Sequence, residues 1–315
     1  MNLDDVQWLQ PLLQCPVCKM DLQRTQAELA CVRGHSFPIV DGIPVLIDEG
    51  ESIFSLSDFT TKSETFYREN TTPFWRAAKR LAQKFVPDIL ENLRSKQNYD
   101  KLSELLASRA KPVVLILGGG TVGAGMEEFI ATPHFRLIES DVAFAPRTAF
   151  IMDGHGIPLK DGSCDAVVAQ GVLEHVIEAE QVVAEIHRVL KPNGLVYAET
   201  PFMQGGHFTP YDFRRYTAIG HRCLFRDFTT VSEGMSMGPA AAALWNFKNL
   251  IIMVTPTRRG KSIASILAHA FFFIRYIDRF LIDRRSAWDG ASLFYFLGEK
   301  SDHRLSNREL IKLYS

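Results

Sequence analysis

Cysteine and histidine residues near the start of the chain have the spacing of metal ligands. Cys15 and Cys18 form a CxxC pair, and Cys31 with His35 forms a second pair. A tight CxxC turn directs two thiolates at one ion, and the second pair completes four ligands of the types that zinc prefers. Four protein ligands leave no open coordination position, so the pattern predicts a structural rather than a catalytic Zn²⁺ site. The alternative, a redox pair, leaves Cys31 and His35 unexplained.

A glycine-rich turn follows the apolar run 113–117. Gly118, Gly120 and Gly123 satisfy the pattern GxGxxG. Glycines at these positions let the backbone approach a bound cofactor closely, and the motif on its own fits more than one nucleotide-like cofactor. The residues that follow must therefore distinguish the cofactor classes.

Three carboxylates follow the next two apolar runs. Glu139 and Asp141 close the run 135–141, and Asp153 follows the run 148–152. A carboxylate at the end of the second strand of a nucleotide-binding sheet accepts hydrogen bonds from ribose hydroxyl groups. Asp141 is the preferred ribose ligand and Glu139 the alternative, while solvated surface carboxylates are the competing interpretation.

A short polar segment follows the apolar run 194–200. It contains a histidine, an aspartate, two arginines and a tyrosine, at His207, Asp212, Arg214, Arg215 and Tyr216. Loops at the carboxyl ends of parallel strands form the ligand crevice of such sheets. His207 is the first candidate for a proton acceptor, and the alternative is that His207 and Asp212 hold the loop through hydrogen bonds. The two arginines are expected either to grip a phosphate or carboxylate or to pair with neighbouring acids.

The elements that must position these groups are apolar runs alternating with helical patterns. Because strands that alternate with helices build a parallel sheet, the order predicts an α/β, doubly wound, Rossmann-like fold. A helix over 177–190 should end at the Pro192 and Gly194 stop signal. The expected strands are 113–117, 135–140, 148–152, 165–170 and 194–200, with two more around 229–235 and 292–300.

The residues from FRLIESD through FIMDGHGIPLKDGSCDAVVAQGVLEHV resemble class I S-adenosylmethionine-dependent methyltransferases, in particular their type 11-like branch. The resemblance implies that the glycine loop wraps the methionine part of the cofactor. It further implies that Asp141 binds the ribose, Asp153 binds the adenine amino group and Gln170 lines the pocket. One position departs from the family, because Ile116 stands where an acidic residue usually supports the methionine amino group.

The segment after Thr200 resembles a bacterial methyltransferase subgroup with the pattern PF…H..PYDF.RYT. There it forms part of the active-site rim. His207 and Asp212 are the catalytic candidates of this segment, and Arg214, Arg215 and Tyr216 are its candidates for binding the acceptor.

The first fifty residues resemble the zinc-ribbon segments of some bacterial rRNA guanine methyltransferases and of the small activator proteins of tRNA methyltransferases. The resemblance rests on LLQCPVCKMDL and CVRGHSFPIVDGIPVLID. It implies that FPIVDGIPVLI forms a short strand pair behind the metal.

The chain is expected to divide into three parts. Residues 1–50 form the zinc-ribbon-like module, 51–110 a helical linker or lid, and 111–315 the methyltransferase domain, with an apolar helical insertion at about 238–290. The apolar stretches of this insertion are interrupted by charges and are shorter than the roughly 20 residues that a bilayer requires. We expect a lid, a homodimer contact or a peripheral membrane contact there.

The composition and net charge of the chain disfavour several classes of protein. A formal net charge of -1 and a pI near 6.8 disfavour a nucleic-acid partner. Five cysteines are too few for a secreted disulfide framework, and Asp4 and Asp5 stand where a signal peptide needs positive charge, so we expect a cytoplasmic protein. The expected enzyme methylates a small molecule, a saccharide or a lipid-linked intermediate. The alternatives are an RNA methyltransferase, a non-catalytic binding or activator module, and a nicotinamide-dependent oxidoreductase.

Overall fold

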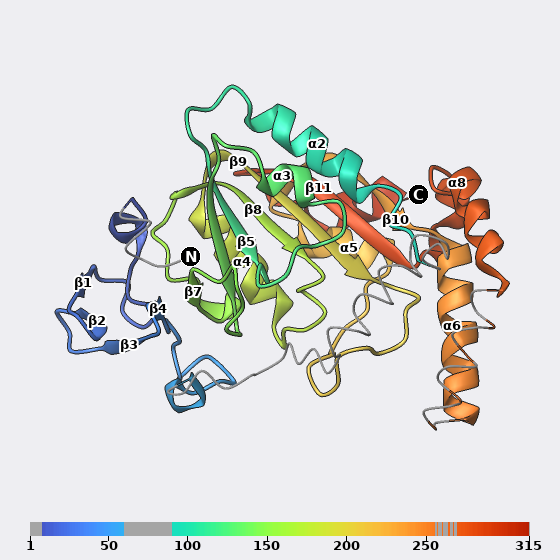
Figure 1. The fold of residues 1–315 in the computed structure, drawn as a ribbon. Coiled ribbons are helices and arrows are strands. Elements are labelled where there is room, and N and C mark those ends of the chain that lie inside the picture. The colour runs from blue at the N-terminus through green and yellow to red at the C-terminus, as the bar shows by residue number, and fades with distance from the viewer. Residues whose placement is uncertain are drawn as a thin grey trace.

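A seven-stranded sheet forms the centre of the larger domain (Figure 1). The computed structural model describes residues 8–59, 90–255 and 270–314, together with residues 257, 260, 264 and 267. The strands lie in the order β10-β11-β9-β8-β5-β6-β7. They are β5 (Val113–Leu117), β6 (Arg136–Asp141), β7 (Phe150–Ile151), β8 (Cys164–Gln170), β9 (Leu190–Pro201), β10 (Phe228–Met237) and β11 (Leu293–Lys300).

The sheet is mixed. Strands β5 to β9 are parallel to one another, whereas β11 lies between β9 and β10 and is antiparallel to both. Each apolar run that predicted a strand contains one, which confirms the Rossmann-like α/β fold. β9 begins earlier than predicted, at Leu190, because the chain is already extended there where the preceding helix ends.

Helices cover both faces of this sheet. The side chains of Val114 and Ile116 pack in one core with α2 (Ser95–Leu106) and α3 (Glu127–Ile130). On the other face lie α4 (Ala179–Val189) and α5 (Ala218–Leu224). The predicted apolar side of α4 is buried against the sheet, as expected, through Val182, Val183, Ile186 and Val189. Of the helical linker or lid expected over 51–110, α2 lies in the last part, and residues 60–89 lie outside the described residues.

Asp165 connects the first residues of three neighbouring strands, β5, β8 and β9, through hydrogen bonds. Its carboxylate accepts the Val113 amide of β5 at 2.9 Å and the Lys191 ammonium of β9 at 2.7 Å, and Arg109 lies 3.3 Å away. Burial opposes ionisation, but the hydrogen bonds from Lys191, Val113 and Arg109 outweigh it and lower the pKa of Asp165. The acidic residue of the DGSCD segment is therefore a structural one.

Asp165→Asn is expected to lower the free energy of unfolding by about 2 kcal/mol at pH 7, because charge-assisted hydrogen bonds are lost. A lowered carboxyl pKa stabilises the fold above the unfolded value of 3.8, and this contribution disappears as the pH falls through the folded pKa. Urea unfolding at neutral and acid pH should therefore show the two proteins converging in acid. Asp161→Asn is the control, since that side chain is 78% exposed and forms a surface ion pair with Arg188; an equal loss in both variants would contradict the assignment.

The N-terminal module is a small antiparallel sheet in the order β1-β2-β3-β4. Its strands are β1 (Leu22–Arg24), β2 (Glu28–Cys31), β3 (Ser36–Val40) and β4 (Ile43–Pro44), preceded by the short helix η2 (Gln10–Leu12). β3 and β4 form the strand pair expected from FPIVDGIPVLI. Asp41 and Gly42 connect them with φ values of 50° and 80°, a left-handed pair that suits a tight hairpin turn.

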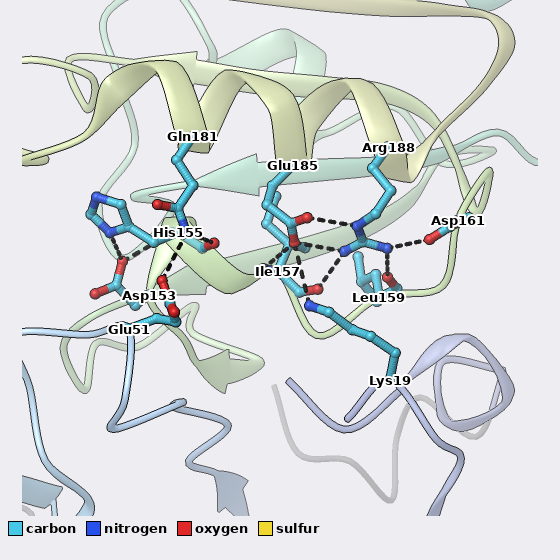
Figure 2. Close-up of polar contacts among 10 residues, drawn as sticks. All are labelled: Lys19, Glu51, Asp153, His155, Ile157, Leu159, Asp161, Gln181, Glu185 and Arg188. Atoms are coloured by element: carbon cyan, nitrogen blue, oxygen red, sulfur yellow. Dashed lines mark hydrogen bonds and ion pairs between the residues drawn. The ribbon is translucent and has the colours of Figure 1, made fainter. Parts of the chain in front are cut away.

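This module docks on the edge of the large sheet. Leu46 donates its amide to the carbonyl of Ile151 in β7 at 2.8 Å, and Val45 pairs with the same residue. Helix α4 adds side-chain contacts, because Glu185 accepts the Ile157 amide at 2.9 Å and lies 3.7 Å from Lys19 of the module (Figure 2). The chain then continues through η3 (Leu56–Phe59).

The C-terminal insertion is led by α6 (Pro239–Val254), which extends away from the sheet (Figure 1). Asp278 caps this helix by accepting the amides of Ala240 and Ala241 at 2.8 and 2.9 Å. The remaining helices are η4 (Gly154–Gly156), η5 (Phe272–Ile277), α8 (Asp278–Leu281), η6 (Arg285–Gly290) and α9 (Asn307–Tyr314). Among the described residues, no helix combines the length and apolar character needed to cross a bilayer.

Candidate functional site

The four predicted metal ligands lie together at two turns of the N-terminal module. The amides of Lys19 and Gly34 close these turns on the carbonyls of Cys15 and Cys31, and both residues have positive φ. The Sγ atoms of Cys18 and Cys31 are 3.6 Å apart, and His35 Nδ1 lies 3.5 Å from Cys15 Sγ and 3.4 Å from Cys31 Sγ. Ligand bonds of about 2.0–2.3 Å in a tetrahedron give edges of roughly 3.5–3.8 Å, so the set fits one Zn²⁺ ion.

The ionisation of Cys31 suits the same chemistry. Burial opposes its ionisation, but backbone hydrogen bonds from His35 and Arg33 outweigh burial and lower the pKa of Cys31 to about 6. A thiolate rather than a thiol is the metal ligand. The two remaining cysteines of the chain, Cys164 and Cys223, lie elsewhere, the first buried and the second exposed.

A pocket opens at the carboxyl ends of β5, β6, β7 and β8. Its empty space, part of it open to solvent, is ≈ 860 Å³, which is within the usual range for cofactor sites. Gly118, Asp141 and Asp153 line it. Other lining residues are Ile53, Phe54, Val142, His155, Val172, His175, Phe208 and Tyr211.

The glycine turn packs directly on the second strand. Gly120 donates its amide to Asp141 Oδ2 at 2.9 Å, and a Cβ at Gly120 would lie 2.6 Å from the same oxygen. Gly118 has φ +67°, and a Cβ there would lie 2.8 Å from Val172. The turn therefore requires glycine at both positions. The expected helix after the turn is only α3, four residues that begin at Glu127.

Asp153 lines the pocket and contacts the segment that follows the N-terminal module. Its carboxylate accepts the Ser52 hydroxyl at 2.5 Å and contacts His155 Nδ1 at 2.5 Å. Burial opposes ionisation, but the hydrogen bonds from His155 and Ser52 outweigh it and lower the pKa of Asp153. The carboxylate beside the pocket is therefore charged, and Ser52, just after the module, helps to hold it.

The second acidic candidate on β6 turns away from the pocket. Glu139 is buried and bound by Arg147 at 2.6 Å, whereas Asp141 lines the pocket. Gln170 also lies outside the pocket lining, because its side chain contacts Tyr99 at 3.1 Å and Glu199 at 2.9 Å. Ile116 is buried under α2 in an apolar core.

The loop after β9 is held by ion pairs. Asp212 accepts the His207 amide at 2.7 Å and pairs with Arg215 through both oxygens. The Arg215 hydrogen bond outweighs burial and lowers the pKa of Asp212 to about 2. Arg214 pairs with Glu180 of α4 at 2.6 Å, and Tyr216 is buried in the core. Of the two roles expected for Arg214 and Arg215, the structure therefore shows pairing with neighbouring acids.

A second polar group adjoins the pocket at the LEH segment. Burial raises the pKa of Glu174 to about 8, and its Oε1 lies 3.8 Å from His175 Nε2. The His175 ring lies 5.1 Å from the His207 ring, which is 6.3 Å from the Trp245 ring of α6. His207 therefore lies beside His175, which lines the pocket, but His207 is not itself part of the lining.

Sequence reasoning missed several residues of the pocket wall. Ile53 and Phe54 come from the segment after the module, and Phe208 and Tyr211 from the loop after β9. These residues belong to irregular segments whose course depends on tertiary contacts. In the sequence, only their positions next to the module and next to His207 indicate that they could belong to the pocket.

Residues 135–198 match the model of a methyltransferase domain family. This segment runs from the start of β6 into β9 and contains Asp141, Asp153 and Glu174. The match supports a class I methyltransferase that uses S-adenosylmethionine. No curated protein matches the chain.

The chain is also similar to solved methyltransferase structures, at low sequence identity. The 1,6-didemethyltoxoflavin-N1-methyltransferase of Burkholderia thailandensis, bound to 1,6-didemethyltoxoflavin and S-adenosylhomocysteine, is 14% identical with a TM-score of 0.40, over 75% of this chain and 93% of that chain. Phosphoethanolamine N-methyltransferase 2 of Haemonchus contortus, in complex with S-adenosylmethionine, is 14% identical with a TM-score of 0.43, over 75% of this chain and 62% of that chain.

Proposed function

We propose that this chain transfers a methyl group from S-adenosylmethionine to a small-molecule, saccharide or lipid-linked acceptor. The observation that carries the proposal is the pocket at the carboxyl ends of the parallel strands, where the Gly118 turn faces two buried carboxylates. Nucleotide-like cofactors bind at this edge of doubly wound sheets.

Each pocket residue has a distinct role in this proposal. Asp141 accepts hydrogen bonds from the ribose hydroxyls, and Asp153, held by His155 and Ser52, accepts the adenine amino group. The glycine turn lies along the methionine part. Gln170 acts indirectly, because a Cβ at Gly123 would lie 2.0 Å from its Oε1, so that Gln170 supports the turn from behind.

The loop after β9 forms the acceptor side. Methyl transfer is an in-line displacement, so orientation supplies much of the catalysis and a base is needed only for a protonated nucleophile. We assign His207 as that base. Asp212 is a poor proton acceptor because its pKa is about 2, and it holds the loop through Arg215.

The four ligands of the N-terminal module support a structural Zn²⁺ ion. In this proposal the ion fixes the two turns, and the strand pair behind it carries the chain to Ser52 and the pocket wall. The module thereby contributes to cofactor binding without contacting the transferred methyl.

The exposed surface and the charge of the C-terminal insertion support the proposal that the acceptor is presented at a membrane. Leu250, Met253, Val254 and Phe280 are at least 60% exposed on α6 and α8. The segment 239–285 carries eight Lys or Arg and two Asp residues, a net charge of +6 (8 − 2), in a chain of net charge -1. An apolar surface within a basic segment favours an anionic lipid interface, whereas two copies of it would repel each other.

We expect the protein to sediment with phosphatidylcholine vesicles that contain phosphatidylglycerol. The double variant Met253→Ser and Val254→Ser should reduce the bound fraction severalfold, because apolar side chains are lost. Val32→Ser, at a side chain that is 73% exposed in the module, is the matched control. A dimer in sedimentation velocity without vesicle binding would instead assign the surface to self-association.

Calorimetric titration of the zinc-replete protein with S-adenosylmethionine and S-adenosylhomocysteine tests the proposed function. We expect both ligands to bind at one site per chain. Absence of binding would favour the non-catalytic binding module, and binding of a nicotinamide cofactor instead would favour the oxidoreductase.

A further inference from the structure

Three side chains on the acceptor side converge outside the cofactor-binding set. Glu174, His175 and His207 each offer one ligand atom, and these atoms all lie within 4.8 Å of one another. Glu174 and His175 follow β8, whereas His207 comes from the loop after β9. Two strand ends therefore deliver a carboxylate and two imidazoles to one point.

The carboxyl group of Glu174 lacks a complete set of partners. The residue is 2% exposed, and within the described part of the chain its Oε2 atom has no hydrogen-bond partner. A buried polar atom without a partner carries a large desolvation cost. Because Glu174 is one of the three converging side chains, a cation bound between them would give its Oε2 atom a partner.

His175 is oriented as a histidine ligand requires. Its Nδ1 lies 2.5 Å from the carbonyl oxygen of Tyr211, and a carbonyl only accepts, so we assign the proton to Nδ1. Nε2 then carries a lone pair directed toward Glu174, 3.8 Å from Oε1. A backbone carbonyl behind the distal nitrogen is the usual second contact of a metal-binding histidine.

The charge around His207 is compatible with a bound cation. Arg215 Nη2 lies 3.4 Å from His207 Nδ1, but Asp212 contacts this guanidinium through both carboxylate oxygens. The arginine charge is therefore largely compensated. A cation on His207 would replace a long and weak hydrogen bond. With the cation bound, His207 would be a ligand and not the base, and the cation would instead lower the pKa of a hydroxyl bound to it.

We propose that Glu174, His175 and His207 bind one divalent cation at the acceptor end of the pocket. Three protein ligands leave coordination positions open, in contrast to the four-ligand cysteine cluster. One carboxylate and two imidazoles suit Mn²⁺, Fe²⁺ or Zn²⁺. The open positions would take oxygen ligands of the acceptor, a hydroxyl pair or a carboxylate; this last step rests on the proposed methyl transfer, whereas the cation site does not.

Mn²⁺ titration followed by electron paramagnetic resonance tests the cation site in the full, zinc-replete chain. Mn²⁺ prefers oxygen and nitrogen to thiolate ligands, so the cysteine cluster does not compete. We expect about one bound Mn²⁺ per chain and at least tenfold weaker binding in Glu174→Gln, because the loss of even an outer-shell partner of a ligand typically costs about 10- to 100-fold in metal affinity. His207→Gln tests the same site at a partly exposed loop residue and covers the case in which Glu174→Gln does not fold.

Glu139→Gln is the matched control, because that carboxylate is also buried but binds Arg147. Undiminished Mn²⁺ binding in His207→Gln and in a folded Glu174→Gln, or no binding by the wild type, would overturn the cation site. Calorimetry with S-adenosylmethionine on the same samples separates the two proposals. Cofactor binding without Mn²⁺ binding would refute only the cation site, and the reverse would refute only the proposed function.

Discussion

Asp141→Asn is expected to weaken the binding of S-adenosylmethionine by about 10- to 100-fold. Charge-assisted hydrogen bonds contribute about 1.5–3 kcal/mol each, and asparagine keeps the shape of the side chain but loses its charge. The amide group also places a donor toward Gly120, whose own N–H now binds Asp141 Oδ2. Calorimetric titration of the variant against the wild type measures this change.

Glu139→Gln is the control for this prediction. The residue lies two positions earlier on the same strand and is buried, but Arg147 binds its carboxylate. We expect its affinity for the cofactor to stay close to that of the wild type. A loss of affinity in Glu139→Gln with none in Asp141→Asn would reverse the assignment of the ribose ligand.

Cys31→Ser is expected to abolish zinc binding and to unfold the N-terminal module. Structural zinc contributes apparent binding free energies on the order of 10 kcal/mol in small domains, and this energy is coupled to folding. Because Ser52 holds Asp153 and Phe54 lines the pocket, cofactor affinity should fall as well. Metal analysis, thermal unfolding and calorimetry on one preparation measure the three effects.

Cys223→Ser separates zinc ligation from the general loss of a thiol. Cys223 is exposed on α5, away from the cluster. The variant should keep one zinc per chain and unaltered cofactor affinity. A Cys31→Ser protein that retained zinc would show that the four residues do not form one site.

The regular elements were predictable because their signals are local. Five buried residues in β5, followed by glycines, indicate a buried strand and a tight turn whatever the rest of the chain does. The cysteine and histidine spacing brought four ligands together for the same reason. The strand pair at Asp41 and Gly42 is likewise specified by its turn residues.

The pocket wall was not predictable from local patterns. Phe54 and Tyr211 are far apart in the sequence, yet their rings lie 5.9 Å apart over the pocket. Gln170 ends the expected strand but faces Tyr99 of α2, a contact that no periodicity reveals. Arg214 and Arg215 left two alternatives open in the sequence, and only the positions of Glu180 and Asp212 show which acids they contact.

The pairing of Val45 and Leu46 with β7 gives the N-terminal module a further consequence. β7 is the outermost strand of the large sheet, and its Ile151 would otherwise present unpaired backbone groups at an open edge. Open edges recruit strands from other molecules and promote aggregation. The module thus caps this edge, and resistance to aggregation is expected to depend on the ion that the module's four ligands would bind.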